Sequence, residues 1–521
     1  MTDKNEIIDE ILDSFSSGGR EVNATEKAQT SDKDSEQGIV EICIKAEMLS
    51  DEGKDEEAFE LWEKGAEYGN AYAQFRLAIC FLIGKGTECD LVAGAALLEK
   101  SAEQGEDRAQ YNLGICYENG YGVEADLSIA AYWYGKSAEQ GNVYAQLAYG
   151  VCLGKGNGVE RNFKEAARWF NLAAEQGSVP AKYLLGECYL DGDGVVEDKV
   201  KAIKLFTEAA EEGYAPAIHS LAVCCEDGNG VEKDISKAFE YYQQAVSQDY
   251  APSQYRLALM YDNGNGVERD YSKAVELYKN SAEQEYADAQ NAYGWCFVVG
   301  KIVKKDFFEA VRWFRRAANQ GNMRAQYNLA MCYEEGHGVQ VNAEKAFEWH
   351  MKAAQQGDDR AQLHVGWSYQ VGNGVKPDRN EAFKWLNKSA EQGNAQALSD
   401  VGYCYFKGIG VKKDKARGFN CYLKAAECGS AMAAYNVGCS YRHGNGVKKD
   451  KLKAIDWYVK AADLGETDAM LSLGNMYERG EGVEKNLHKA YGWFKKAFDG
   501  GVQLAELILN KKKYKSISVG K

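Results

Sequence analysis

The sequence predicts an all-α solenoid, a stack of helix–turn–helix units, and two observations support this. Valine returns every 36 residues through most of the 521-residue chain, and two stretches of helical apolar spacing lie between successive valines. Such units cannot bury their own apolar faces alone and must stack on neighbours. We therefore expect one repeating core instead of several separate domains. The valines are Val123, Val159, Val195, Val231, Val267, Val303, Val339, Val375, Val411, Val447 and Val483, with Thr87 at the first position.

The unit at residues 325–357 shows how each first helix should form. Ala325, Leu329 and Tyr333 fall at helical spacing and give one apolar face. The position of Ala330 is Ala or Gly in all twelve units. We expect this small residue to let a second helix approach closely.

A glycine loop and a capped second helix should complete the unit. Gly336 and Gly338 precede Val339, and a glycine past the last helical turn adopts the left-handed C-cap conformation. Three residues after the valine stands Asp or Asn in every unit, Asn342 here, which predicts an N-cap. We interpret this row as caps and not as catalytic carboxylates. The second helix then ends at a turn glycine, Gly357.

These residues, A-x-x-x-L-G-x-x-Y-x-x-G-x-G-V-x-x-D followed by A-x-x-W-x-x-x-A-A-x-x-G, resemble the Sel1-like repeat family, a relative of tetratricopeptide repeats. The resemblance implies an α/α right-handed superhelix that acts as an adaptor or scaffold for protein complexes. Some cysteine-rich relatives are described as penicillin-binding or β-lactamase-like. Those relatives carry paired cysteines, whereas this chain has one cysteine per unit.

The chain outside the regular repeats supports a four-part organisation. Residues 1–38 predict a disordered acidic tail, because they are polar and hold few large apolar residues. Residues 39–70 resemble a tetratricopeptide-like N-terminal cap without the glycine loop, and residues 71–501 hold twelve repeats. Residues 502–521 predict a C-terminal capping helix with a basic tail.

The repeat pattern breaks between residues 249 and 308. The turn glycine becomes Asp249 and then Glu285, and the second loop glycine becomes Ile302. Because Glu tolerates a left-handed φ poorly, we expect these turns to differ in shape. Extra apolar residues follow, so the region is either a local change of superhelical pitch or an exposed apolar patch used in binding. They are Val298, Val299, Phe307 and Phe308.

The cysteines predict buried thiols, not disulfides or metal sites. Eight of the fourteen share one repeat position, and equivalent residues of stacked helices lie roughly 10 Å apart. That separation exceeds the ~7 Å Cα limit for a disulfide. No Cys or His pair has metal-ligand spacing, and the six histidines fall at unrelated repeat positions, so we expect no metal and no cofactor. The eight are Cys80, Cys116, Cys152, Cys188, Cys224, Cys296, Cys332 and Cys404.

The net charge, the lack of long apolar stretches and the N-terminal sequence indicate which partners and which location to expect. A net charge of −16 argues against nucleic acid and anionic membranes. No stretch approaches 18 apolar residues, and the acidic N-terminus lacks signal-peptide features, which favours a cytoplasmic location without membrane insertion. Residues 1–120 hold 27 acids and 11 bases, whereas residues 401–521 hold 12 and 22. The basic loop edge either attracts an acidic partner to the C-terminal half or is a solvated edge.

The first helices supply the candidate binding residues. In tetratricopeptide-type stacks these helices line a concave groove, and Tyr and Trp suit such a surface. The same tyrosines could instead pack between neighbouring helices, and the asparagines form an incomplete ladder. The candidates are Tyr111, Asn112, Tyr183, Tyr255, Trp295, Tyr327, Asn328, Trp367, Tyr403, Tyr435 and Asn436.

The predicted function is therefore a non-catalytic scaffold that binds a peptide or protein partner, with no catalytic residues. Two alternatives remain: a β-lactamase-like or penicillin-binding enzyme, and a spacer that self-associates through its oppositely charged ends. The sequence indicates neither the oligomeric state nor the partner.

Overall fold

The computed structural model describes residues 36–511 and Tyr514, which form two compact units. Unit 1 ends at Met260 and also includes Asn265–Glu268; unit 2 comprises Tyr261–Gly264 and everything described from Arg269 onward. The predicted disordered tail, residues 1–38, lies outside the described residues up to residue 35, and residues 36–38 are not disordered but begin helix α2 (Glu36–Asp51). Most of the basic tail, with Lys512, Lys513 and Lys515, also lies outside the described residues.

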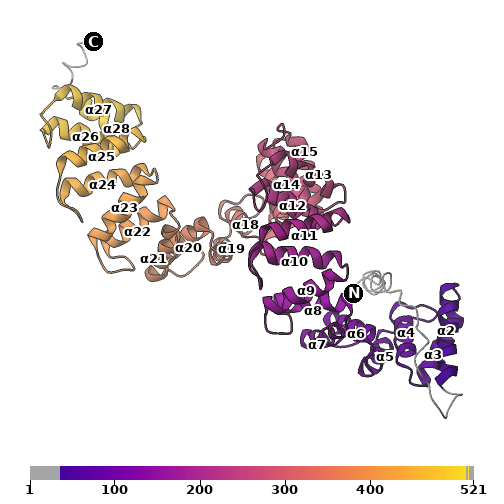
Figure 1. Ribbon diagram of the computed structural model, residues 1–521. Helices are drawn as coiled ribbons and strands as arrows, with labels where there is room; N and C mark the ends of the chain where they lie inside the picture. Colours follow the sequence, from indigo (N-terminus) through magenta and orange to yellow (C-terminus); the bar gives the residue numbers. More distant parts are fainter. Residues whose placement is uncertain (1–35, 512–513, 515–521) are drawn as a thin grey trace. The chain divides into compact units, whose positions relative to one another are not determined.

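All regular structure in the described residues is α-helical, as predicted, and the helices follow one another in stacked pairs within each unit (Figure 1). In unit 1 they are α2 (Glu36–Asp51), α3 (Asp55–Glu67), α4 (Ala71–Ile83), α5 (Leu91–Glu103), α6 (Asp107–Asn119), α7 (Leu127–Glu139), α8 (Val143–Lys155), α9 (Phe163–Glu175), α10 (Val179–Asp191), α11 (Lys199–Glu211), α12 (Ala215–Asp227) and α13 (Ile235–Val246). Helix α14 (Ala251–Asn263) begins in unit 1 and ends in unit 2.

Unit 2 continues the alternation of first helices (even numbers) and second helices (odd numbers). Its helices are α15 (Tyr271–Glu283), α16 (Ala287–Val299), α17 (Phe307–Asn319), α18 (Met323–Glu335), α19 (Ala343–Gln355), α20 (Asp359–Val371), α21 (Arg379–Glu391), α22 (Ala395–Lys407), α23 (Lys415–Glu427), α24 (Ala431–His443), α25 (Lys451–Asp463), α26 (Thr467–Arg479), α27 (Leu487–Asp499) and α28 (Gln503–Leu509).

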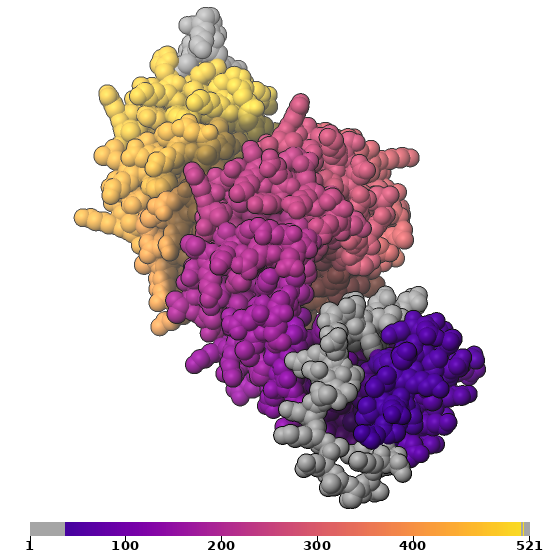
Figure 2. Space-filling model, turned by 45° about the vertical axis from the view of Figure 1, so that its right-hand side comes forward, coloured from indigo at the N-terminus to yellow at the C-terminus, as the bar shows by residue number. Residues whose placement is uncertain are grey.

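Each helix packs mainly on its neighbours in the sequence. All extensive helix–helix contacts of the described residues join consecutive helices. In the space-filling view, the orange-to-yellow part of unit 2 accordingly follows chain order (Figure 2). Stability in such a stack comes from each unit and its two interfaces. None of the described helices combines the length and apolar character that crossing a bilayer requires.

In the eight repeats where the small residue of the first helix is glycine, it receives a large side chain from the second helix of the same repeat. A Cβ added to Gly114 would lie 2.5 Å from the ring of Tyr134, and one added to Gly186 would lie 2.5 Å from Phe206. Both rings are buried. The prediction that this position permits close helix approach is confirmed.

The two loop glycines of a repeat have different structural roles. Gly336 has φ 76° and its N–H donates to the carbonyl of Cys332, which confirms the predicted C-cap. Gly338 has φ 69°, and a Cβ there would lie 2.2 Å from the backbone oxygen of Phe307. The loop thus lies directly against the start of the preceding repeat's second helix, where a side chain would not fit.

All twelve predicted N-caps are confirmed. In each, the side-chain oxygen accepts a hydrogen bond from a backbone N–H in the first turn of the second helix, as Asn342 does from Lys345. The others are Asp90, Asp126, Asn162, Asp198, Asp234, Asp270, Asp306, Asp378, Asp414, Asp450 and Asn486.

The expectation that the turns at Asp249 and Glu285 differ in shape is wrong. Both residues adopt the left-handed conformation of the turn glycines, with φ 60° and 61°. Each side chain accepts a hydrogen bond from a glutamine five residues later: Gln254 to Asp249 at 2.6 Å and Gln290 to Glu285 at 2.7 Å. Ile302 does differ from the loop glycines, because it has no positive φ.

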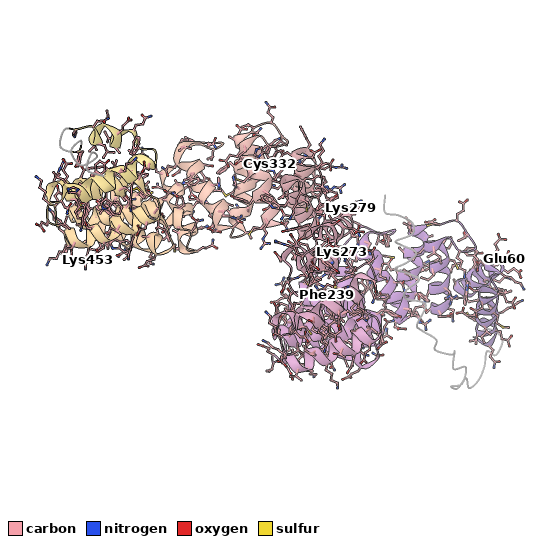
Figure 3. The ribbon with its side chains drawn as sticks, turned by 90° about the horizontal axis from the view of Figure 1, so that it is seen from above. Glu60, Phe239, Lys273, Lys279, Cys332 and Lys453 are labelled. Carbon is pink, nitrogen blue, oxygen red and sulfur yellow. The ribbon has the colours of Figure 1, made fainter. Side chains whose placement is uncertain are left out.

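The eight cysteines at the common position are free thiols, six of them buried and two half-buried. Burial raises the pKa of each, to about 11 for Cys332 and about 12 for Cys116. Figure 3 labels Cys332, which lies on α18. All fourteen cysteines lie in the described residues and none forms a disulfide.

Candidate partner-binding face

The candidate residues all lie on first helices. We call the side-chain positions equivalent to Tyr111, Asn112 and, one turn on, Ile115 the first-helix face. The candidates are distributed as follows: Tyr111 and Asn112 on α6, Tyr183 on α10, Tyr255 on α14, Trp295 on α16, Tyr327 and Asn328 on α18, Trp367 on α20, Tyr403 on α22, and Tyr435 and Asn436 on α24.

In unit 1 the first-helix face contains a pocket of about 620 Å³. Tyr111 from α6 and Leu147 from α8 line it at equivalent repeat positions, and Val179 and Pro180 come from the start of α10. Three successive repeats therefore contribute to one depression. Apolar and aromatic walls of this kind suit an apolar side chain of a partner.

Four of the candidate tyrosines, Tyr111, Tyr183, Tyr327 and Tyr435, are half-buried, and each packs on a ring from the second helix of its own repeat. The ring centroids of Tyr111 and Tyr134 are 5.7 Å apart, and those of Tyr435 and Tyr458 are 5.6 Å apart. Burial raises the pKa of Tyr435 to about 12, so its hydroxyl stays protonated. The packing role considered from the sequence is thus present, and it leaves part of each ring accessible.

In unit 2, side chains of the first-helix face join successive repeats. Asn328 Nδ2 donates to Asn291 Oδ1 at 2.9 Å, linking α18 to α16. Trp367 Nε1 donates to Asp400 Oδ2 at 2.8 Å, linking α20 to α22. Burial raises the pKa of Asp400. The bond from Trp367 holds its indole ring in a fixed position.

The asparagines are not equivalent. Asn112 is buried and its Nδ2 donates to the carbonyl of Arg108 in the same helix, so it is turned away from the open face. Asn328 is already bonded to Asn291, and Asn436 is half-buried.

The most accessible candidates are Trp295, 51% exposed, and Tyr403, 46% exposed. Within the irregular region, Val299, Ile302 and Phe308 are also exposed, Phe308 to 76%. These residues have the exposure that a binding patch needs.

Sequence reasoning missed a pairing between the two helices of a repeat. The hydroxyl of Tyr134 donates to Glu118 at 2.6 Å, and that of Tyr242 donates to Glu226 at 2.7 Å. The acid stands 16 residues before the aromatic residue, which is a signal visible in the sequence. In one repeat the same spacing pairs Glu334 with His350.

Two further histidines on the first-helix face were also missed. His219 Nδ1 lies 2.8 Å from Ser253 Oγ, and burial together with nearby Arg256 lowers the pKa of His219 to about 4. His364 packs between Tyr327 and Trp367, with ring centroids 5.9 and 5.4 Å away. The spacing argument predicted no metal-binding group, yet His350, His364 and Glu334 lie together with ligand atoms within 4.8 Å.

Comparison with known proteins decides the family. The Sel1 repeat profile matches thirteen consecutive segments, from a partial one at residues 52–70 to one at residues 467–502. The chain belongs to the Sel1 repeat family. The remaining segments are 71–106, 107–142, 143–178, 179–214, 215–250, 251–286, 287–322, 324–358, 359–394, 395–430 and 431–466.

Solved structures agree with this membership. The chain is similar to c5321, a protective antigen of uropathogenic Escherichia coli strains with a Sel1-like repeat fold. The two are 33% identical over 87% of this chain and 97% of that one, with a TM-score of 0.55. A Sel1 repeat protein from Oxalobacter formigenes is 31% identical over 47% of this chain and 96% of that one, with a TM-score of 0.43. The search of curated proteins finds no match.

Proposed function

We propose that this Sel1 repeat protein is a non-catalytic scaffold that binds a peptide or protein segment on its first-helix face. The supporting observations are the partly exposed aromatic side chains on five successive first helices of unit 2, α16 to α24, and the pocket beside Tyr111 in unit 1. Rigid aromatic side chains supply contact area at little entropic cost, and they dominate many interfaces.

Charge adds a second element to the proposal, an acidic partner segment near the C-terminal half. The loop lysines there are exposed. Attraction between exposed charges weakens with salt, so affinity for such a partner should fall as ionic strength rises. These lysines are Lys412, Lys413, Lys448 and Lys449.

A cytoplasmic location belongs to the same proposal. The chain carries fourteen free thiols and no disulfide in its described residues, as is usual where thiols are kept reduced.

The test is affinity purification with the full chain, followed by measurement of the recovered partner's affinity for variants. Tyr403→Ala and Trp295→Ala should each weaken binding about 10- to 30-fold, the range of interface hot spots. Tyr132→Ala is the matched control, because Tyr132 is 55% exposed but lies on a second helix, α7. Equal affinity for all four proteins would refute the proposed face.

A further inference from the structure

One repeat of unit 2 differs from all others in the residues at the junction of its helices. At the second-helix position that holds Tyr134 and Tyr242 elsewhere, this repeat has His350. His350 lies on α19, Glu334 on α18 and His364 on the next first helix, α20. Two imidazoles and one carboxylate therefore converge from three consecutive helices.

Both imidazole–carboxylate contacts are at the long end of hydrogen-bonding distance. His350 Nε2 and His364 Nδ1 each lie 3.3 Å from the same atom, Glu334 Oε2. Hydrogen bonds to a carboxylate are shorter, about 2.7–2.9 Å. Zinc–ligand bonds of about 2.0–2.1 Å give a tetrahedron with an edge of roughly 3.3 Å, which matches both separations.

We propose that Glu334, His350 and His364 bind one divalent transition-metal ion, with zinc the best match. Two imidazole nitrogens and one carboxylate oxygen form a donor set that zinc uses, and three protein ligands leave a fourth position for water. The inference is independent of the proposed partner binding.

The site has both a fixed and an accessible side. His350 is 2% exposed, whereas the side chains of His364 and Glu334 are 17% and 35% exposed. Tyr327 and Trp367 flank His364 on the first-helix face, so an ion can enter from that side.

Binding requires one small rearrangement. The two imidazole rings are stacked, with centroids 4.5 Å apart and planes at 13°, so one ring must turn for both nitrogens to point at a single ion. His364 is the more exposed of the two rings, so it is the one that we expect to turn. His350 Nδ1 has no hydrogen-bond partner, and a missing outer-shell partner typically weakens metal affinity about 10- to 100-fold.

The experiment is equilibrium dialysis of the full chain against micromolar zinc, with cobalt(II) absorption as a report on coordination. His350→Tyr introduces the residue that the repeats of Tyr242 and Tyr278 carry at this position, and His364→Asn introduces that of Asn328 in the preceding repeat. Both variants should keep the fold of the metal-free protein, checked by circular dichroism and thermal melting. His443→Asn, which changes an exposed histidine on α24, is the control.

The wild type and His443→Asn should each bind one zinc per chain and give a cobalt spectrum of tetrahedral type. His350→Tyr and His364→Asn should bind at least about 100-fold more weakly. The proposal is overturned if the wild type binds no zinc at micromolar concentration, or if both site variants bind it as the wild type does.

Discussion

At the scale of single residues, Asp249 and Glu285 show how a side chain can replace a glycine. A non-glycine residue in the left-handed region costs roughly 1–2 kcal/mol. The hydrogen bonds from Gln254 and Gln290 offset part of this cost, because a bond to a charged acceptor contributes about 1.5–3 kcal/mol. The turn keeps its shape through this compensation.

The balance between backbone strain and the hydrogen bond can be tested at Glu285. Glu285→Gly loses the bond from Gln290 but also loses the backbone strain, so stability should stay within about 1 kcal/mol of the wild type. Glu285→Ala keeps the strain and loses the bond, and should be less stable than the glycine variant by about 1 kcal/mol. Urea unfolding of both variants checks the order.

Glu283→Ala serves as a control, because Glu283 has only an exposed ion pair with Lys279. It should change stability by no more than about 0.5 kcal/mol. An alanine variant at 285 as stable as the glycine variant would show that this turn carries no backbone strain for the hydrogen bond to offset.

The sequence predicts the caps well and the site poorly, for a physical reason. A cap depends on a single residue within its own turn, so the residue types of Asn342 and Gly336 are enough to predict their caps from the sequence. The His350–Glu334 pair depends on two positions that vary together from repeat to repeat, and His364 joins from the next repeat. Such a group becomes visible only once the stacking brings the positions together.

At the scale of helices, polar pairs join consecutive repeats. In unit 1, Gln104 Nε2 donates to Gln74 Oε1 at 2.7 Å, and Gln140 does the same to Gln110 at 2.8 Å. In unit 2 the equivalent pairs are Gln320–Gln290, Gln356–Gln326 and Gln392–Gln362. Each pair connects the end of a second helix to the preceding first helix.

In one repeat, a lysine and a glutamate stand at the two glutamine positions. Lys182 Nζ lies 3.0 Å from Glu212 Oε1 at the same two positions, 30 residues apart. The interface thus accepts either a neutral amide pair or an ion pair, provided that the two members complement each other. Mismatch should be costly, since the Lys182 side chain is largely buried.

A mutant cycle tests this complementarity. Lys182→Glu places two carboxylates together and should lower stability by about 1 kcal/mol or more, and adding Glu212→Lys should recover most of the loss. The Lys182→Gln/Glu212→Gln double variant should stay within about 0.5 kcal/mol of the wild type. Thermal melting at low and high salt measures all three.

The salt dependence of this stability loss distinguishes repulsion between the two carboxylates from a change in packing. The penalty of Lys182→Glu should shrink at high salt, because screening weakens repulsion between partly exposed charges. A penalty that is independent of salt, or that Glu212→Lys does not relieve, would argue against the pairing.

At the scale of the molecule, the contacts between neighbouring helices make each repeat a local unit of stability. A repeat inside a stack has two interfaces and an end repeat has one, so unfolding should progress from the ends. The buried and half-buried cysteines of the common position place a reporter in five repeats of unit 1 and three repeats of unit 2.

The rate at which each cysteine of the native protein reacts with a thiol reagent should therefore follow the exposure of its side chain. Cys89 and Cys428 are exposed and should react fastest with N-ethylmaleimide at neutral pH. Burial and raised pKa values should protect Cys80 and Cys152, each with a pKa of about 11, since the thiolate is the reactive form.

As denaturant is added, Cys80 near the end of unit 1 should become reactive before Cys152. Peptide mapping by mass spectrometry identifies each labelled site, and Cys89→Ser with Cys428→Ser should remove the fast phase. Rapid native labelling of Cys152, or simultaneous exposure of both cysteines, would contradict local stability of the repeats.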